Sequence, residues 1–373
     1  MKVKLGELTR IKTGKLDANA SSENGEYPFF TCSKDPLRIS SYSYDCECVL
    51  VAGNGDLNVK YYNGKFDAYQ RTYIIEGNGS DRLYMPYLFY FMDGYVEELR
   101  KLSIGGVIKY IKLGNLTDAL IELPDVQTQK EIVSILAKAK TIVESRRKEL
   151  HTLDDLIKAR FVEMFGEPIA NPMSWPVKPL KALSSLITNG NTPKGGSENY
   201  VDDGVFFLRS QNVWRNRIDL SDVAYIDEET HFSMKKSSVH KNDILITKTG
   251  RINTDNSSLG RAALYIGEDD SANINGHVYL VRLNGGINPR FVVTILTGEA
   301  YRKYIRKVCV GGIDKRQINL DQVEDFPIIQ PPIEEQIKFA DFAEQIDKSK
   351  FVVQKALEKA QLLFDSLMQK YFG

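Results

Sequence analysis

The chain carries one pattern of residues twice, at a distance far too long for a solenoid repeat. Residues 124–129 open a long amphipathic segment that ends at residues 165–166, and residues 331–336 open another that ends at residues 372–373. Positions 124 and 331, 129 and 336, and 165 and 372 are each 207 residues apart. Because a repeat sets the architecture, the sequence predicts two copies of one module, each a globular region followed by a long helix.

Both long segments have the seam of a coiled coil. In each, a series at seven-residue spacing is apolar at every position, and a companion series alternates with it by four and three residues. The pattern predicts two spacer helices, within residues 124–166 and 331–373, that pack on each other. The heptads alone leave parallel and antiparallel pairing open. The predicted seam residues are Leu136, Val143, Leu150, Ile157, Met164, Phe339, Ile346, Val353, Ala360 and Leu367.

Two charged residues interrupt the companion series, Arg146 in the first helix and Lys350 in the second. Such a charge either fixes the register of the pair or extends along the seam edge toward water. Residues 167–174, a linker rich in helix breakers, lead from the first helix to the second globular region. If the helices are antiparallel, a pseudo-twofold axis relates the two globular regions.

The globular regions, residues 1–123 and 175–330, contain patterns typical of mixed α/β structure, so the predicted fold class is α+β. Apolar runs bounded by turn residues predict strands, and longer amphipathic runs predict one short helical segment in each region. The predicted strands are 48–52, 71–75, 243–247 and 277–281, the turns 53–56 and 63–64, and the helical segments 85–102 and 289–308.

Polar, basic and glycine-rich loops separate these strands. Arginine, lysine, asparagine and glutamine can pair with base edges, and glycine lets a backbone approach phosphate. Each loop taken alone is an ordinary solvated turn, but their number favours nucleic-acid binding. The candidate DNA-binding residues are Lys12, Lys15, Arg71, Lys109, Thr192, Lys194, Arg209, Gln211, Asn212, Arg215, Lys248, Arg251, Asn275, Lys315 and Arg316.

Composition limits the compartment and the strength of DNA binding. The N-terminus has no signal-peptide core, no apolar run is long enough for a membrane span, and four cysteines form neither a disulfide framework nor a zinc pattern. These features favour the cytoplasm. With 49 basic and 49 acidic residues the formal net charge is zero, which argues against a strongly basic nucleic-acid binder. We therefore expect the chain alone to bind DNA weakly.

Several of these segments resemble one known family. Residues 175–180 followed by residues 190–193 resemble the start of a target-recognition domain. Residues 331–336 with the long helix that ends at residues 372–373 resemble that family's spacer region. Over essentially its whole length, the chain is similar to the specificity subunit of type I restriction–modification systems. The first spacer departs from the second, because Asp125 stands where the second has Pro332.

The resemblance implies a fold and a set of partners. Each target-recognition domain would read one half of a bipartite double-stranded DNA site, and the two helices would pack as an antiparallel coiled coil that sets the spacing. Two adenine-N6 methyltransferase subunits would dock on this scaffold, and a restriction–translocation subunit would join them. The resemblance implies no cofactor and no catalytic residue in the chain itself.

The residues themselves suggest no active site. Residues 53–55 follow a strand but run into another strand and turn, which favours a hairpin over a nucleotide-binding turn. The chain has no phosphate-binding P-loop motif, Pro331 and Pro332 lack the flanking residues of an adenine methyltransferase motif, and the four histidines lack metal-ligand spacing. We therefore expect a non-catalytic subunit without a metal.

Three alternatives stay open from the sequence. The chain could be a stand-alone DNA-binding regulator, or the recognition subunit of a system whose partner fuses methyltransferase and nuclease. A structural or adhesive scaffold that binds protein or glycan is the third, and the absence of an export signal argues against it. A methyltransferase that copurifies with the chain would argue against the regulator.

Overall fold

The computed structural model describes residues 2–254 and 256–373 and divides into two compact units. Unit 1 contains residues 1–149 and 353–373, and unit 2 contains residues 150–352. Each unit therefore holds one globular region together with part of each long helix, α3 (Val126–Phe165) and α8 (Ile333–Phe372). None of the helices in the described part of the chain combines the length and apolar character that a membrane span requires.

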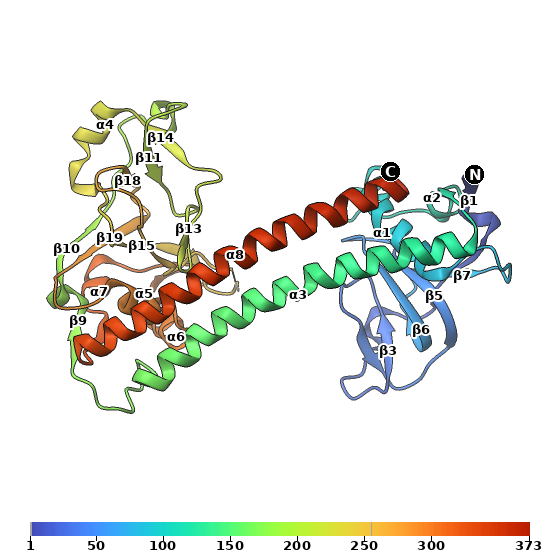
Figure 1. Ribbon diagram of the computed structural model, residues 1–373, viewed down its shortest axis with the longest axis horizontal. Coiled ribbons are helices and arrows are strands. Elements are labelled where there is room, and N and C mark those ends of the chain that lie inside the picture. The colour runs from blue at the N-terminus through green and yellow to red at the C-terminus, as the bar shows by residue number, and fades with distance from the viewer. Residues whose placement is uncertain (1, 255) are drawn as a thin grey trace. The chain divides into compact units, whose positions relative to one another are not determined.

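Unit 1 is built around a mixed sheet in the order β2-β7-β5-β6-β3-β4, with β1 and β8 paired separately. Helix α1 packs on one face of this sheet, and its Pro86 lies in the first turn, where no backbone N–H is needed (Figure 1). The elements of the unit are β1 (Lys2–Lys4), β2 (Thr9–Thr13), β3 (Tyr27–Phe30), β4 (Leu37–Ile39), β5 (Tyr44–Ala52), β6 (Val59–Ala68), β7 (Thr72–Gly77), α1 (Met85–Leu102), α2 (Leu113–Thr117) and β8 (Leu120–Glu122).

Unit 2 repeats this plan with insertions. Its main sheets have the orders β10-β19-β15-β17 and β14-β11-β18. The elements are β9 (Val177–Pro179), β10 (Ser184–Asn189), β11 (Val205–Leu208), β12 (Val213–Trp214), β13 (Arg217–Ile218), β14 (Ala224–Ile226), α4 (Glu228–Ser233), β15 (Ile244–Thr247), β16 (Thr249–Arg251), β17 (Ala262–Leu264), β18 (Ala272–Ile274), β19 (Val278–Leu283), α5 (Pro289–Thr297), α6 (Glu299–Val308), β20 (Val310–Gly311), β21 (Lys315–Gln317), α7 (Leu320–Glu324) and β22 (Pro327–Ile329).

The two units share the strand arrangement that surrounds their cores. The antiparallel set β2-β7-β5 of unit 1 corresponds to β10-β19-β15 of unit 2. The parallel pair of β3 and β6 corresponds to the parallel pair of β11 and β18. Strand β15 and residues 48–52 of β5 lie between neighbouring strands and are buried on both faces, which accounts for their continuous apolar runs. The predicted α+β fold with two globular regions and two long helices is confirmed.

The two long helices run antiparallel, because in unit 2 Asp154 contacts Lys350 and the later Phe161 contacts the earlier Phe339 (Figure 1). In unit 1 the Arg147 side chain donates to Gln361 Oε1 at 2.9 Å. In unit 2 the Lys350 ammonium donates to the Asp154 carboxylate at 2.5 Å, so this interruption of the companion series is paired across the helices. All ten predicted seam residues are buried or half-buried, with Leu136 and Phe339 fully enclosed.

A glutamine near the start of each long helix fixes it to its globular region. The Gln129 amide accepts from Tyr84 N at 2.8 Å and donates to the carbonyls of Arg82 and Pro124. Gln336 accepts from Asn288 N at 3.0 Å and donates to the Pro331 carbonyl at 2.8 Å. Both amides are buried, so these bonds are formed without competition from water.

Replacing Gln129 with leucine should lower the free energy of unfolding of unit 1 by about 1–3 kcal/mol, because three partly buried backbone groups would lose the buried amide as their partner. Gln127 is the matched control, since it lies two residues earlier, is exposed, and donates its side-chain amide to the exposed Glu131 carboxylate. Denaturant unfolding of Gln129→Leu and Gln127→Leu measures the difference. Equal stability of the two variants would contradict this role of the buried amide.

Two local predictions are wrong. The predicted turn at Asn63 and Gly64 lies inside β6, where Gly64 is paired with Cys46 and its φ of 135° accommodates the strand without a reversal. The predicted helical segment 289–308 is two helices, because Gly298 adopts an extended conformation between α5 and α6. The predicted domain boundaries at residues 123, 166, 174 and 330 stay a prediction.

Candidate nucleic-acid interface

In unit 1 the polar loops predicted from the sequence meet at one edge of the sheet. Strand β5 ends at this edge, and the loop after it lies beside the segment that leads into β7, with Gly53 N donating to Arg71 O at 2.8 Å. The loop after β2 joins them through Gly14 N and Thr72 O, 3.0 Å apart. The segment after α1 completes the edge, with Gly55 N donating to Lys109 O at 3.0 Å. We call this end of β5 the loop edge of unit 1.

The same loops meet at the equivalent edge of unit 2, where β15 ends. Gly190 N donates to Val278 O at 3.1 Å, and Lys248 N donates to His277 O at 2.9 Å. Strand β16 then pairs with β21, which places Gly250 opposite Arg316. The loop edge is therefore a feature of the repeat, and the residues that occupy it differ between the two units.

Two glycines hold the loop edges together by close approach. A Cβ atom on Gly14 would lie 2.1 Å from the Ala68 carbonyl oxygen, and one on Gly190 would lie 2.0 Å from that of Ile274. Neither position can carry a side chain without a backbone shift. The two glycines thus bring the loop after β2, or after β10, against the loop that precedes β7 or β19.

The structure brings many of the predicted DNA-binding residues to these edges. They are exposed or half-buried and come from loops that contact one another through the bonds above. Thr192 Oγ1 belongs with them, because it lies 3.8 Å from the position of a Cβ on Gly276. The predicted residues at the edges are Lys15, Arg71, Lys109, Thr192, Lys194, Lys248, Arg251, Asn275, Lys315 and Arg316.

Other predicted residues are engaged within the fold. The Lys12 ammonium pairs with the Glu76 carboxylate at 2.5 Å on the sheet face, where burial lowers its pKa but Glu76, with Cys46 and Tyr44, raises it overall. Gln211 Nε2 donates to Asp222 Oδ2 at 2.7 Å. Asn212 is 1% exposed and bonds to backbone atoms of residues 209, 219 and 222, which leaves it inaccessible to a ligand.

The Arg209 side chain, close to Asn212 in unit 2, is also held by contacts within the fold. Its guanidinium donates to the backbone carbonyl of Asp222 and lies 3.4 Å from that residue's carboxylate. It also lies 6.0 Å from the centroid of the Tyr200 ring. These contacts keep its side chain only 21% exposed. Arg209 and Asn212 therefore build the turn after β11 and lie outside the proposed interface.

An arginine cluster around Trp214 was missed by the sequence analysis. The Arg261 guanidinium lies 4.0 Å from the indole centroid, and that of Arg217 lies 5.3 Å from it. Burial, followed by the charges of Arg215 and Arg217, lowers the pKa of Arg261. Gathered cations of this kind attract anions such as phosphate. Arg261 is separated by more than forty residues from Trp214 in the sequence, so no local pattern could reveal the cluster.

The cluster adjoins the loop edge of unit 2. Thr247, the last residue of β15, donates its backbone N–H to Arg261 O at 2.9 Å. The Arg261 Nε donates to the carbonyl of Ser257 at 3.0 Å, and Ser257 in turn lies against Gly250 of β16. Arg215, which was predicted, is exposed at the tip of the hairpin formed by β12 and β13. Arg261 itself is only 8% exposed, so Arg215 and Arg217 form the accessible part of this cluster.

Across residues 2–254 and 256–373, no three histidine, cysteine or carboxylate side chains gather as a metal site would require. Burial raises the pKa of the Cys46 thiol to about 11 and that of Cys48 further, which disfavours both nucleophilic thiolates.

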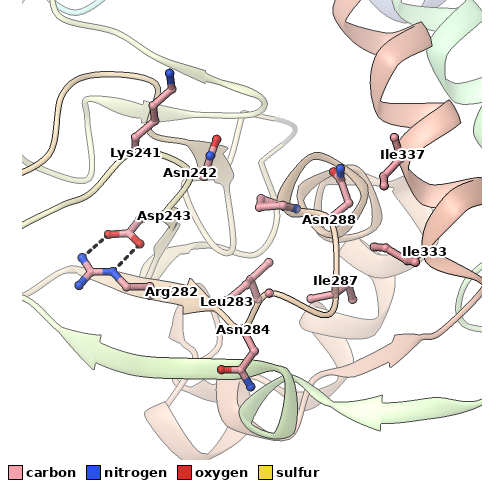
Figure 2. Close-up of a pocket in the computed structure, with 12 residues that line it drawn as sticks. Lys241, Asn242, Asp243, Arg282, Leu283, Asn284, Ile287, Asn288, Ile333 and Ile337 are labelled. Carbon is pink, nitrogen blue, oxygen red and sulfur yellow. Dashed lines mark hydrogen bonds and ion pairs between the residues drawn. The ribbon is translucent and has the colours of Figure 1, made fainter.

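A hollow of about 360 Å³ lies at the opposite end of β15 from the loop edge. Its buried charged group, Asp243, forms a two-bond ion pair with Arg282 at 2.7 and 2.9 Å, as Figure 2 shows. Ile287 and Ile337 contribute to its apolar side (Figure 2). Because the carboxylate and the guanidinium satisfy each other, we interpret the hollow as a packing feature of the unit.

Comparison with known proteins assigns the family. The model of the type I restriction modification DNA specificity domain matches residues 1–153 and 172–362. The chain is 39% identical over 156 residues to the EcoDI specificity subunit of the type I restriction enzyme of Escherichia coli, covering 42% of this chain and 34% of that protein. It therefore spans about a third of the length of this curated relative.

Two solved structures share the fold. The S subunit of a type I restriction–modification system from M. genitalium superposes with a TM-score of 0.63 at 16% identity, covering 100% of this chain and 96% of that one. A structure of a type I R-M system that describes complex assembly and conformational transition gives a TM-score of 0.53 at 14% identity, with coverages of 100% and 97%. The chain belongs to the type I restriction modification DNA specificity family.

Proposed function

We propose that the chain is the non-catalytic DNA-recognition subunit of a type I restriction–modification complex. The observation that carries this proposal is the loop edge, which the same scaffold forms in both units from different residues. A repeated scaffold with divergent loops suits the reading of two unlike half-sites. Family membership supports the same function. Each unit then reads one half of a bipartite double-stranded DNA site.

The two long helices are proposed to set the spacing between half-sites and to dock two adenine-N6 methyltransferase subunits. Apolar residues outside the predicted seam support a docking role, because each is at least 42% exposed. In unit 1 they include Ile135, Ile142, Leu362 and Leu363, and in unit 2 Leu156 and Ile337. Ile135, Ile142 and Leu156 stand at multiples of seven residues, which suits packing against further helices. A restriction–translocation subunit is the third proposed partner, in the cytoplasm.

The exposed apolar residues on the long helices also favour a subunit of a complex over a stand-alone DNA-binding regulator. A regulator that used only the two loop edges would need no partner on the helices, whereas exposed apolar residues at regular spacing mark an interaction surface. The variant in which one partner fuses methyltransferase and nuclease uses the same surface. We propose separate methyltransferase subunits and let copurification distinguish the two.

Methyl transfer tests the function directly. We expect label from S-adenosylmethionine to reach DNA when the chain is copurified with its methyltransferase subunit. The chain alone should transfer none, because no catalytic constellation was identified in its sequence. The methyltransferase alone should lack sequence-specific transfer, since the proposal assigns recognition to this chain. Turnover by the isolated chain, or specific transfer without it, would contradict the proposal.

A further inference from the structure

A loop of the same construction follows the short helices in both units. In unit 1 it contains residues 105–109 and is closed by the backbone bonds between Ile104 and Tyr110, at 2.9 and 3.0 Å. In unit 2 it contains residues 311–316, and its flanking residues Val310 and Gln317 are paired in β20 and β21. We call these two segments the Gly-Gly loops.

Both Gly-Gly loops are fastened to the loop edge at the same point. Tyr110 forms a β-bridge with Asn54, and its counterpart Gln317 pairs with Thr249. Asn54 and Thr249 belong to the segments that follow β5 and β15. The loops are therefore part of the proposed DNA-binding surface and extend outward from it.

Each Gly-Gly loop presents a β-branched apolar side chain entirely to water. Val107 is 104% exposed and Ile313 is 91% exposed, and Ile108 beside Val107 is 64% exposed. Single exposed apolar residues are ordinary, but here both copies of the repeat place one at the tip of the same loop. Basic residues stand within three positions of each tip, Lys109 in unit 1 and Lys315 with Arg316 in unit 2.

The fold explains only the first glycine of each loop. Gly105 and Gly311 have φ values of 117° and 128°, and a Cβ on either would lie within 2.9 Å of a carbonyl oxygen of the same loop. At Gly106 a Cβ would meet no atom within 4 Å, and at Gly312 its nearest neighbour would lie at 3.9 Å. Both second glycines also lie outside the left-handed region. The isolated units thus have room for a side chain at both.

We propose that the two Gly-Gly loops insert against the bases of the DNA site, with Val107 and Ile313 making apolar contacts and Gly106 and Gly312 marking the points of closest approach. This inference rests on the proposed function, because it names the residues that make apolar contacts with the DNA. Apolar side chains recognise the thymine methyl group in the major groove or enter between base steps in the minor groove. Flanking cations at the loop base suit the phosphates on either side.

One acid also stands in this region of unit 2. Asp314 follows the tip residue, and its carboxylate lies 3.4 Å from the Nε of Arg251, with both side chains more than half exposed. This ion pair neutralises the acid in the free chain. An apolar contact from Ile313 requires no charge, so the pair does not oppose the proposed insertion.

Glycine-to-alanine substitutions test the close approach. We expect Gly106→Ala and Gly312→Ala each to weaken specific DNA binding by at least about tenfold, with an unchanged or raised melting temperature, because the free fold has room for the methyl group. Gly286→Ala is the matched control. A Cβ there also meets nothing within 4 Å, and Gly286 follows the end of β19 that points away from the loop edge. Equal affinity of all three variants would overturn the proposal.

Polar substitutions test the apolar tips. Val107→Asn and Ile313→Asn should each reduce affinity by about tenfold while the slope of log affinity against log salt stays constant, since no phosphate contact is lost. Lys109→Gln should instead reduce the magnitude of that slope by about one, which is the contribution of one phosphate contact. Ile266→Asn is the control, because Ile266 is 81% exposed at the far end of β15. A changed slope for Val107→Asn, or a loss equal to that of Ile266→Asn, would contradict the apolar contact.

The probes are the duplex that carries the motif methylated by the complex and a scrambled duplex of equal length, each titrated with the chain bound to its methyltransferase subunit. If the wild-type complex does not prefer the motif duplex, the proposed function fails. If it prefers that duplex and the loop variants match their controls, only the present inference fails. Loss of the methyltransferase subunit from the variants on gel filtration would also overturn it, because the loops would then contact protein.

Discussion

Replacement of Phe339 with alanine should destabilise unit 2 by about 3–5 kcal/mol, the cost of removing a fully enclosed phenyl ring. Phe339 is 0% exposed on α8 and contacts two rings of α3, with centroids 5.3 Å from Phe161 and 5.8 Å from Phe165. Both of those rings also contact Phe291 of α5. The substitution therefore weakens the helix pair and its attachment to the globular region together.

Phe232→Ala is the matched control for this prediction. Phe232 lies in the same unit, but its side chain is 66% exposed, so truncation should change the free energy of unfolding by less than about 1 kcal/mol. Denaturant unfolding followed by tryptophan fluorescence measures both variants, because Trp175 and Trp214 belong to unit 2. Similar midpoints for the two variants would show that the aromatic group does not hold the helices.

The second large effect concerns specificity. Exchanging residues 1–123 for the corresponding segment of a relative should change one half of the recognised DNA site completely and leave the other half unaltered. The reason is that each unit forms its loop edge from its own loops, whose backbone bonds stay within the unit. The reciprocal exchange of residues 175–330 should alter only the opposite half. Methylated motifs recovered from cells expressing each chimera report both halves at once.

The chimeras also provide an internal control on folding. Both retain the long helices and the glutamines Gln129 and Gln336, so methyltransferase docking should persist in each. A chimera that methylates DNA with both half-sites changed would refute independent recognition by the two units.

The helices were predictable because their determinants are local and repeated. Heptad spacing placed every seam residue in a buried or half-buried position, and the offset of 207 residues identified the second copy. Antiparallel pairing was not contained in the heptads, and it entered as an implication of the family resemblance. Within unit 2, the contacts of Lys350 with Asp154 and of Phe339 with Phe161 show it directly.

The interface was predictable in part. Glycine and basic residues in loops indicated where Arg71, Lys109 and Lys315 lie, since the ends of neighbouring strands bring such loops together. Sequence could not distinguish an accessible polar residue from one that builds a turn, as for Asn212, whose partners are backbone atoms. Arg261 was missed for a related reason, because its neighbour Trp214 is distant in the chain and adjacent only in the fold.

The turn error at Asn63 and Gly64 has a similar origin. An Asn-Gly pair favours a reversal when nothing else competes, but here β6 pairs with β5 along its length, and Gly64 is opposite Cys46. The strand pairing on either side overrides the local preference.

Methylome sequencing tests the central claim most directly. Cells that express this chain with its adenine methyltransferase subunit are compared with cells that express the methyltransferase subunit alone. The account predicts a new methylated motif in two specified parts separated by unspecified base pairs, present only when the chain is expressed. A continuous motif, or a motif that persists without the chain, would contradict the reading of two half-sites by two units.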